Sequence, residues 1–435
     1  MSAGTPDVVD VVGVGFGPAN LALAIALREH ADEGNGVEAV FFEAQPEPAW
    51  HEGMLLEGAS MQISFLKDLV TFRNPHSPFS FVSFLHAHGR LVDFTNRGSF
   101  EPLRVEFAAY LRWAAAAFAD LVHYDARVER IVPVRSAPDG AVDAFEVVVA
   151  SADGVRTVRA RTVVVAAGLQ PRFPDGVASG ARVWHSAEYL HRVGELTEPR
   201  RLAVIGTGQS AMEVALDLSD RFPDAVVHVV SSQFGVGPSD QGPLVNGIFD
   251  PATVDLWYGA PDDVRTRLDR THRNANNGVA SMSVISAFHD RQYHDAWLGR
   301  ERLVLHRASR VVAVADGAVG ARLRVRAELE GIETELAVDA VVCGTGYRPL
   351  DTAVLLGADA ALLRRDAEGR AVLGRDHVAE LTAPGDARLV LVGQGEHRHG
   401  LTSTLLSTVA VRAGEIADVL VGAVDPAVKG SHVPV

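Results

Sequence analysis

The chain has 435 residues, of which 47% are hydrophobic and 22% charged, and its formal net charge is −15. This length exceeds a usual single core of about 100–200 residues, so two or three packed units are expected. The acidic balance argues against a nucleic-acid partner, because phosphate backbones attract basic surfaces. A single cysteine, Cys343, excludes an internal disulfide and any multi-cysteine metal site, and it fits a reducing, cytoplasmic environment.

The sequence shows neither a targeting segment nor a membrane span. Residues 1–7 lack the basic start of a signal peptide. The longest uncharged stretch, residues 11–27, is shorter than the about 20 apolar residues that cross a bilayer, and glycines, a proline and an asparagine interrupt it. We therefore predict a soluble protein with no membrane partner.

The first motif is a strand–turn–helix–strand pattern near the N-terminus. Residues 8–14 are apolar and β-branched, which is typical of a strand buried on both faces. Residues 21–28 read as a helix, and a second apolar run, residues 37–42, ends at Glu43. This order predicts a βαβ unit that binds a dinucleotide, in which Glu43 accepts hydrogen bonds from ribose hydroxyls.

The turn after the first strand is rich in glycine. Gly13, Gly15 and Gly17 allow a tight turn whose backbone N–H groups reach a pyrophosphate at the positive end of the helix. Pro18 departs from the simplest form of this fingerprint, although proline is tolerated in the first turn of a helix. An incidental glycine turn is the alternative, but strand, helix and acidic residue together favour a cofactor site.

A second glycine turn follows the same plan. Residues 201–205 and 226–230 read as strands, and residues 213–218 read as a helix. The turn before the helix contains Gly206, Gly208 and Ala211. Alanine at the third position still allows close helix–strand packing, so we predict a second dinucleotide site, with a purely structural turn as the alternative. After Ser231 no lysine or arginine occurs before Arg265, so on charge alone NADH is a plausible ligand.

These motifs define the expected domain organisation. We predict an α/β protein with two Rossmann-like dinucleotide-binding domains, one for FAD and one for NAD(P)H, and a small helical substrate layer. The FAD-binding domain comprises residues 1–175 and 338–435, and the NAD(P)H-binding domain comprises residues 176–240 and 291–337. Residues 241–290 lack strand periodicity and are the expected substrate-binding segment.

Two nucleotide sites in one chain suggest a flavoprotein that is reduced by a nicotinamide. The single cysteine leaves no Cys-X-X-Cys pair, which excludes a disulfide reductase of the thioredoxin-reductase type. The hydride taken from the nicotinamide must then go to oxygen, a quinone or another acceptor.

The stretch of residues 50–73 narrows this further. It resembles the flavin-dependent N-hydroxylating monooxygenases, the L-ornithine N5-monooxygenase and L-lysine N6-monooxygenase family of siderophore pathways, and it is nearer to the ornithine branch. Further matches to this family are residues 13–21, 208–211, 243–251, 344–347 and 396–407.

The resemblance implies a set of site residues and a mechanism. The implied flavin contacts are Trp50, His51, Met61 and Gln62, together with Leu401 and Ser407 in a C-terminal flavin and substrate loop. The implied nicotinamide-cofactor contacts are Gln209 and Ser210 beside the second glycine turn. The implied substrate residues are Lys67, which pairs with the substrate carboxylate, and Asn246 and Asn276 around the amino-acid head group. In this family, reduced FAD and O2 form a C4a-hydroperoxyflavin, and the retained oxidised nicotinamide shields it.

Plainer interpretations exist for some of these residues. Lys67 lies among apolar residues, where an unpaired ammonium is unfavourable, so a snorkelling lysine or a salt bridge with Asp68 is the alternative. Asn246 and Asn276 could be turn residues. His397 and His399 lack clustered carboxylates or cysteines, so we predict no metal site and expect polar groups near the flavin.

The sequence departs from the family pattern in two places. Residues 277–281 replace a familiar Tyr-Ser-Val-Val-Asp, which affects the expected substrate pocket. Ser232 and Gly237 stand where arginines are common, one of which serves the 2′-phosphate of NADPH. This predicts weakened NADPH selectivity, and the hypothesis is that the enzyme tolerates NADH unusually well.

The sequence therefore predicts N-hydroxylation of the terminal amine of L-ornithine with FAD, NADPH or NADH, and O2. Such an amine, with a lysine-like pKa of about 10.4, must be neutral to react, which a dry pocket favours. The alternatives are the same chemistry on L-lysine or a diamine such as putrescine, an NAD(P)H oxidase or flavin reductase, and a redox-sensing binding protein. The resemblance also implies a homotetramer or homodimer.

Overall fold

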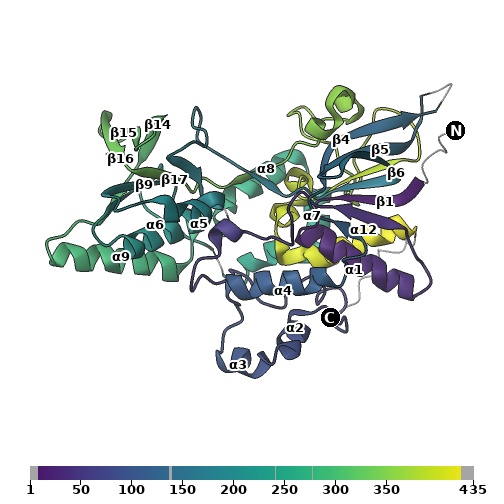
Figure 1. Ribbon diagram of the computed structural model, residues 1–435, viewed down its shortest axis with the longest axis horizontal. Helices are drawn as coiled ribbons and strands as arrows, with labels where there is room; N and C mark the ends of the chain where they lie inside the picture. Colours follow the sequence, from purple (N-terminus) through teal and green to yellow (C-terminus); the bar gives the residue numbers. More distant parts are fainter. Residues whose placement is uncertain (1–7, 137–139, 241, 277, 423–435) are drawn as a thin grey trace.

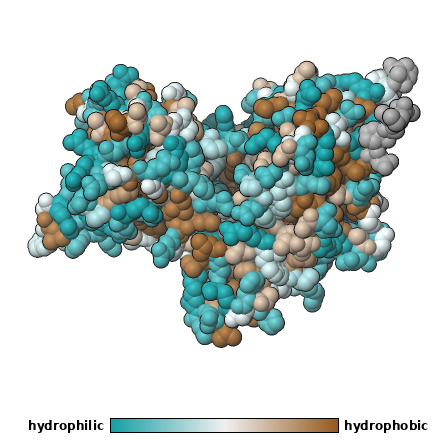
Figure 2. Space-filling model, in the orientation of Figure 1, coloured by the Kyte–Doolittle hydropathy of each residue, from teal (hydrophilic) through white to brown (hydrophobic). Residues whose placement is uncertain are grey.

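The computed structural model describes residues 8–136, 140–240, 242–276 and 278–422. Two lobes, each built on a largely parallel sheet, lie side by side, with helices α7 (Pro251–Gly259) and α8 (Asp262–Thr271) between them (Figure 1). The surface is hollowed between the lobes at the top of the view in Figure 2. Among the described residues, no helix is long and apolar enough to span a membrane.

The first lobe contains the N-terminal βαβ unit. Its seven strands follow the order β3-β2-β1-β6-β5-β4, with β19 also paired to β6. Strands β4 and β5 extend the sheet as antiparallel neighbours, whereas the other pairs are parallel. The strands are β1 (Val8–Val14), β2 (Ala39–Phe42), β3 (Val122–His123), β4 (Arg127–Arg135), β5 (Val142–Ser151), β6 (Gly154–Val165) and β19 (Arg388–Leu391).

Helices cover one face of this sheet, and a loop-rich segment covers the other. The apolar core on the first face joins helices α1, α4 and α12 to buried side chains such as Phe41 and Val164. The core on the second face includes Leu355 and Leu389. The helices of this lobe are α1 (Pro18–Asp32), α2 (Phe81–Ala87), α3 (Leu91–Asn96), α4 (Arg104–Ala116), α10 (Ala353–Leu356) and α12 (Val409–Val421).

The second lobe contains a five-stranded parallel sheet in the order β13-β10-β9-β17-β8. Helices α6 (Gln209–Arg221) and α9 (Met282–Trp297) pack on one face, and an antiparallel three-stranded sheet, β14-β15-β16, covers the other. The strands are β8 (Val183–His185), β9 (Arg201–Ile205), β10 (Val226–Val230), β13 (Leu303–His306), β14 (Ser309–Asp316), β15 (Ala321–Ala327), β16 (Ile332–Val338) and β17 (Ala340–Cys343). The predicted α/β class with two Rossmann-like sheets is therefore confirmed.

One predicted boundary is wrong. We expected the chain to return to the first domain at residue 338, but β17 pairs with β8 and β9 in the second sheet. The chain crosses back only after β17, where β18 (Tyr347–Pro349) pairs with the outgoing strand β7 (Leu169–Pro171). A short apolar strand that ends in a glycine turn suits either sheet, so its residues alone do not indicate which sheet it joins.

The segment predicted as a helical layer also differs in detail. It contains η4 (Val245–Phe249), α7, α8 and η5 (Arg273–Ala275), as expected from its lack of strand periodicity. However, β11 (Gly237–Pro238) and β12 (Val279–Ala280) form a short parallel pair at its two ends. Helix α9 starts within the predicted segment and continues past residue 290, and it packs on the second sheet.

Candidate active site

The first glycine turn is shaped by close packing of the backbone. A Cβ at Gly13 would overlap the ring of Phe41, and one at Gly15 would lie 2.7 Å from the carbonyl oxygen of Ala166. Gly15 also has φ of +83°, which L side chains rarely adopt. A Cβ at Gly17, in contrast, would meet nothing within 4 Å, so space remains open where the chain enters α1.

Glu43 is held directly beside this turn. Its carboxylate accepts the backbone N–H of Phe16 at 2.7 Å and that of Gln45 at 2.8 Å, one on each oxygen. Each carboxylate oxygen can accept a further hydrogen bond, so the group remains available to a ligand hydroxyl. Burial and the charge of Glu43 raise the pKa of the neighbouring Tyr124 to about 12, so this phenol stays protonated.

The second glycine turn lies at the corresponding edge of the second sheet. Gly206 has φ of +112°, and a Cβ there would lie 2.5 Å from the carbonyl oxygen of Gly344. Gly208 precedes the first residue of α6, and a Cβ on Gly344 would lie 2.5 Å from that of Ala211. The helix therefore packs tightly against β17 and its following turn, as the alanine in this motif predicts.

A chain of side-chain hydrogen bonds connects the two lobes. Gln62, from the first lobe, donates from Nε2 to Oε1 of Gln209 at 3.0 Å. The same oxygen accepts the backbone N–H of Ser281 at 2.8 Å, and Nε2 of Gln209 donates to Oε1 of Glu213 at 2.8 Å. These residues and Met61 line a cavity of about 440 Å³. The structure thus brings together the predicted flavin contacts Met61 and Gln62 and the predicted nicotinamide contact Gln209.

An ion pair that the sequence analysis missed continues this chain. Arg104, in α4, forms a two-pronged ion pair with Glu213, in α6, with N–O distances of 2.9 and 3.0 Å. Only 12% and 7% of the two side chains are exposed. Arg104 also donates to the carbonyl oxygen of Met54 at 2.7 Å. The partners are separated by 109 residues of sequence, and no local pattern signals their pairing.

Trp50 and His51 lie between the lobes. Their ring centroids are 4.7 Å apart, and the His51 ring lies 6.1 Å from that of Tyr347, which follows β17. Although part of His51 stays exposed, desolvation and the positive charge of Arg104 lower its pKa to about 4. The imidazole is therefore neutral at physiological pH and can both donate and accept a hydrogen bond.

Lys67 faces the segment between the lobes. Its Nζ lies 5.6 Å from the ring centroid of Phe249 in η4, the turn that also contains Asn246. Desolvation lowers the pKa of Lys67, and the carboxylate of Asp250 partly opposes that shift. Asp68 does not pair with it among the described residues. Its carboxylate instead accepts backbone N–H groups, including that of Phe81 at 2.7 Å.

Asn276 is less closely placed. It is exposed and ends the short helix η5, and its backbone N–H donates to the carbonyl oxygen of Arg273 at 3.3 Å. The described residues show no side-chain contact between Asn276 and Lys67. The next residue, Asn277, which departs from the family pattern, lies outside the described residues. Ser210, in the first turn of α6, is next to Gln209 on the second lobe.

The predicted C-terminal loop is buried, and a residue of the following helix, α12, holds it in place. Leu401 and Ser407 are 4% exposed each. The buried Arg412 donates to the carbonyl oxygens of Thr402 and Leu405 at 2.9 and 3.3 Å, which holds the loop between them. Burial lowers the pKa of Arg412 to about 10, so its guanidinium stays charged at physiological pH.

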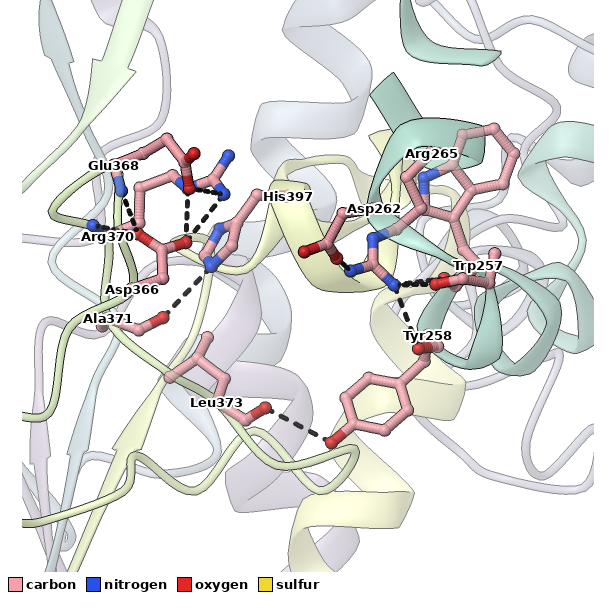
Figure 3. A network of polar contacts seen from close by, with 11 residues as sticks. Trp257, Tyr258, Asp262, Arg265, Asp366, Glu368, Arg370, Ala371, Leu373 and His397 are labelled. Carbon is pink, nitrogen blue, oxygen red and sulfur yellow. Dashed lines mark hydrogen bonds and ion pairs between the residues drawn. The ribbon is translucent and has the colours of Figure 1, made fainter. Parts of the chain in front are cut away.

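The two nearby histidines contact the backbone. His399 stacks on His377 with ring centroids 4.1 Å apart and hydrogen-bonds to the carbonyl of Gly374. His397 points to the carbonyl oxygen of Ala371 at 3.1 Å, as Figure 3 shows. The prediction that these histidines are polar groups close to a flavin stays a prediction.

Figure 3 also shows how the helical segment is attached to the first lobe. The hydroxyl of Tyr258 in α7 reaches the carbonyl oxygen of Leu373 at 3.4 Å. The buried Arg265 of α8 donates to the carbonyl oxygens of Trp257 and Tyr258 and so closes the end of α7. The ring of Trp257 packs against Gly400 at the start of the C-terminal loop. The segment therefore has fixed contacts with the loop that precedes α12.

Comparisons with known proteins agree with this architecture. Residues 7–349 match the family model described as L-lysine 6-monooxygenase/L-ornithine 5-monooxygenase. The L-ornithine N(5)-monooxygenases of Burkholderia cepacia and Pseudomonas aeruginosa are 40% and 37% identical to this chain, over 90% and 95% of its length and 90% and 94% of theirs.

A solved structure is similar across the whole fold. The ornithine N-hydroxylase of Kutzneria sp. 744, with reduced FAD, NADP+ and L-ornithine, is 43% identical, with a TM-score of 0.91 over 95% of this chain and 99% of that one. The resemblance predicted from residues 50–73 is thereby confirmed. The chain belongs to the L-lysine 6-monooxygenase/L-ornithine 5-monooxygenase family.

Proposed function

We propose that this chain N-hydroxylates the terminal amine of L-ornithine, using FAD, NADPH and O2, for hydroxamate siderophores or related natural products. The observation that carries the proposal is the position of Lys67. It is a half-buried ammonium that faces the turn containing Asn246 from the same lobe as Met61 and Gln62. Bound FAD, once reduced, would supply the electrons that activate O2 for transfer of one oxygen atom to the amine.

The residues of the first lobe fit FAD. There is no room for side chains at Gly13 and Gly15. The space around Gly17 admits a pyrophosphate at the N-terminus of α1, which starts at Pro18. Glu43 is held where a ribose hydroxyl can donate to it. We assign the remaining flavin contacts to Trp50, His51, Met61, Gln62, Leu401 and Ser407.

On the second lobe, the turn at Gly206 and Gly208 with the N-terminus of α6 takes the nicotinamide cofactor, with Gln209 and Ser210 as contacts. Because Gln209 already bonds to Gln62, a nicotinamide held by the second lobe would lie against the flavin side of the cleft. Glu213 fixes the amide of Gln209 through its Oε1 and leaves the bridging oxygen of Gln209 to Gln62 and Ser281. These residues would orient the cofactor at the junction of the lobes.

The substrate must bind with its α-carboxylate charged and its terminal amine neutral. Lys67 pairs with the α-carboxylate, and Asn246 and Asn276 hydrogen-bond to the amino-acid head group. The terminal amine must reach the flavin without its proton, which a water-poor site promotes by penalising the charged form. His51 is neutral, so it contributes no positive charge to the site in which the amine must lose its proton.

A second candidate substrate is a diamine. Asp250 lies close enough to Lys67 to raise its pKa, so a carboxylate is present at the place where a diamine would carry its second ammonium. L-lysine, which is one methylene longer than L-ornithine, is the third candidate within the family.

The test is a substrate panel on FAD-loaded protein with L-ornithine, L-lysine, putrescine and no amine. Hydroxylamine formed per NADPH oxidised is measured for each. Coupled product from L-ornithine alone supports the proposal, and product from putrescine alone would assign the site to diamines. Oxidation of NADPH that yields only hydrogen peroxide with all amines would identify an oxidase and contradict the proposal.

Two further proposals concern the cellular state of the protein. We propose a cytoplasmic location and a homo-oligomer, either a tetramer or a dimer. Light scattering during size-exclusion chromatography would measure the mass of the assembly, and a monomeric mass would contradict the second proposal. Fractionation of the producing cells would test the first.

A further inference from the structure

The turn that follows β10 is electrically neutral. In a Rossmann unit, the residues after the second strand meet the adenosine ribose: an acid accepts from the 2′-hydroxyl of NADH, whereas a cation pairs with the 2′-phosphate of NADPH. Here residues 231–235 contain neither. The hydroxyl of the buried Ser231 is already used, since it donates to the carbonyl oxygen of Gln233 at 2.9 Å and accepts the N–H of that residue at 3.0 Å.

A cation reaches this turn from the neighbouring strand. Strand β13 runs parallel to β10, with His306 level with Val230, so Arg307 emerges at the same edge of the sheet. Two backbone hydrogen bonds flank it: the N–H of Ser231 donates to His306 at 3.0 Å, and the N–H of Ala308 donates to Gln233 at 2.9 Å. The two turns are therefore joined on either side of Arg307.

The Arg307 side chain lies over the neutral turn. Its Nη1 donates to the carbonyl oxygen of Phe234 at 3.0 Å and lies 3.8 Å from where a Cβ on Gly235 would be. Its Cζ lies 5.6 Å from the centroid of the Phe234 ring, which is 69% exposed. Among the described residues, the guanidinium forms no ion pair, so its remaining N–H groups are available to an anion.

We propose that Arg307 determines nicotinamide-cofactor specificity by binding the 2′-phosphate of NADPH, in place of a cation within the turn after β10. The inference rests on the proposed function only in taking the second lobe as the nicotinamide site. A planar guanidinium can donate two parallel hydrogen bonds to a phosphate, and its contact with Phe234 holds it in place beforehand. The enzyme then selects NADPH despite Ser232, contrary to the hypothesis of NADH tolerance.

A neighbouring arginine provides a matched control. Arg310 lies three residues further along, is exposed like Arg307, and already pairs with Glu328 at 2.6 Å. Its removal deletes the same charge from the same lobe without touching the turn after β10. Both variants lose one positive charge, so any difference between them is due to where that charge lies.

The experiment measures the first half of the reaction without any amine. Anaerobic flavin reduction by NADPH and by NADH is followed in FAD-loaded wild type, Arg307→Ala, Arg307→Lys and Arg310→Ala. Binding of 2′,5′-ADP and 5′-ADP to the same proteins is measured by calorimetry. Loss of a charge-assisted phosphate contact should lower the NADPH-to-NADH ratio of the second-order rate constant for flavin reduction by about 10- to 100-fold in Arg307→Ala.

The outcomes separate this inference from the proposed function. We expect wild type and Arg310→Ala to prefer NADPH and 2′,5′-ADP, Arg307→Ala to lose that preference, and Arg307→Lys to recover part of it. A wild type that treats NADPH and NADH alike, or an Arg307→Ala variant with the wild-type ratio, would overturn the inference. Because no amine is present, failure to hydroxylate L-ornithine leaves this result readable.

Discussion

The two glycine turns share a geometry but present different groups to a nucleotide. In both, a glycine with positive φ sits against a backbone carbonyl: Gly15 against Ala166, and Gly206 against Gly344. After the second strand, the first lobe offers Glu43, which the backbone of the turn itself holds. The second lobe offers a neutral turn instead. The first lobe suits a ribose whose free hydroxyl can donate to a carboxylate. The second lobe suits a cofactor whose ribose is recognised by residues outside the neutral turn.

The difference extends to how each half of the site is built. On the flavin side, backbone groups and glycines define the space, so a wrong residue closes it. On the nicotinamide and substrate side, single side chains from separate elements meet in addition to the glycine turn, such as Gln209 with Gln62 of the first lobe and Glu213 with Arg104. Changes on the first side should therefore be all-or-none, whereas those on the second should be graded.

The largest expected effect is at Gly15. A Gly15→Val variant should fail to retain FAD, because valine cannot adopt φ of +83° without strain and its Cβ would meet Ala166. The ratio of flavin absorbance to protein absorbance measures this directly, and circular dichroism checks that the fold survives.

Gly36→Ala is the matched control for that variant. Gly36 lies in the same βαβ unit, between α1 and β2, and a Cβ there would meet only that of Ala31 at 3.9 Å, so alanine there should keep most of the FAD. A Gly15→Val protein that purifies fully yellow would show that the flavin side is not built from the backbone as we describe.

The next effect is expected at Lys67. Lys67→Ala should raise KM for L-ornithine by about 10- to 100-fold, since a charge-assisted pair with the carboxylate is lost. The rate of flavin reduction by NADPH should change far less, because the role proposed for Lys67 is in binding the amino acid and not the nicotinamide cofactor. An unchanged KM would contradict its role, and Lys67→Arg, which retains the charge, serves as the comparison.

Some features of the fold and the site could be predicted from neighbouring residues in the sequence, whereas others depend on contacts between distant segments. The glycine turns and Glu43 lie in local patterns of strand, turn and helix, so residues within about 30 positions are enough to predict them. The role of Lys67 is predicted only from the resemblance of residues 50–73 to a known family. Arg104 with Glu213, and Arg307 with the turn after β10, meet only because strands and helices from distant segments pack together. Such pairs carry no mark in the sequence of either partner.

The same reason explains the misplaced boundary at residue 338. Strand β17 is apolar and ends in a glycine turn, as does the end of β6 in the other sheet, so both fit the same description. What assigns β17 to the second lobe is its pairing with β9 and the packing of Gly344 against Ala211. Both are contacts between segments more than 100 residues apart.

A smaller effect is expected at the junction of the lobes. Glu213→Gln leaves the charge of Arg104 buried and unpaired, which should lower Tm by about 5 °C or more. It also alters the partner that orients Gln209, so a larger share of NADPH should be oxidised without product. Glu335→Gln removes an exposed pair with Arg322 and should leave Tm nearly unchanged. Equal Tm values for both variants would show that the buried pair does not hold the lobes together.

The smallest expected effect concerns Asp250, whose charge acts on Lys67 through partly exposed surroundings. Desolvation lowers the pKa of Lys67 and Asp250 raises it, so Asp250→Asn should lower it further. Because the ammonium is the form that binds a carboxylate, KM for L-ornithine should begin to rise at a lower alkaline pH in the variant than in wild type. Below that pH, the competing carboxylate is gone and KM should fall by about two- to fivefold, within the range of a screened surface pair.

Putrescine should respond in the opposite direction to the same change. It has no carboxylate for Lys67, and any binding of its second ammonium would use Asp250, so Asp250→Asn should raise its KM at every pH. KM profiles from pH 7 to 10 for both amines measure the two responses side by side. If KM changes in the same direction for both amines, Asp250 acts only on the stability of its own turn and not on the charge of the substrate. Single charges on the substrate side would then not give the graded effects that distinguish it from the flavin side.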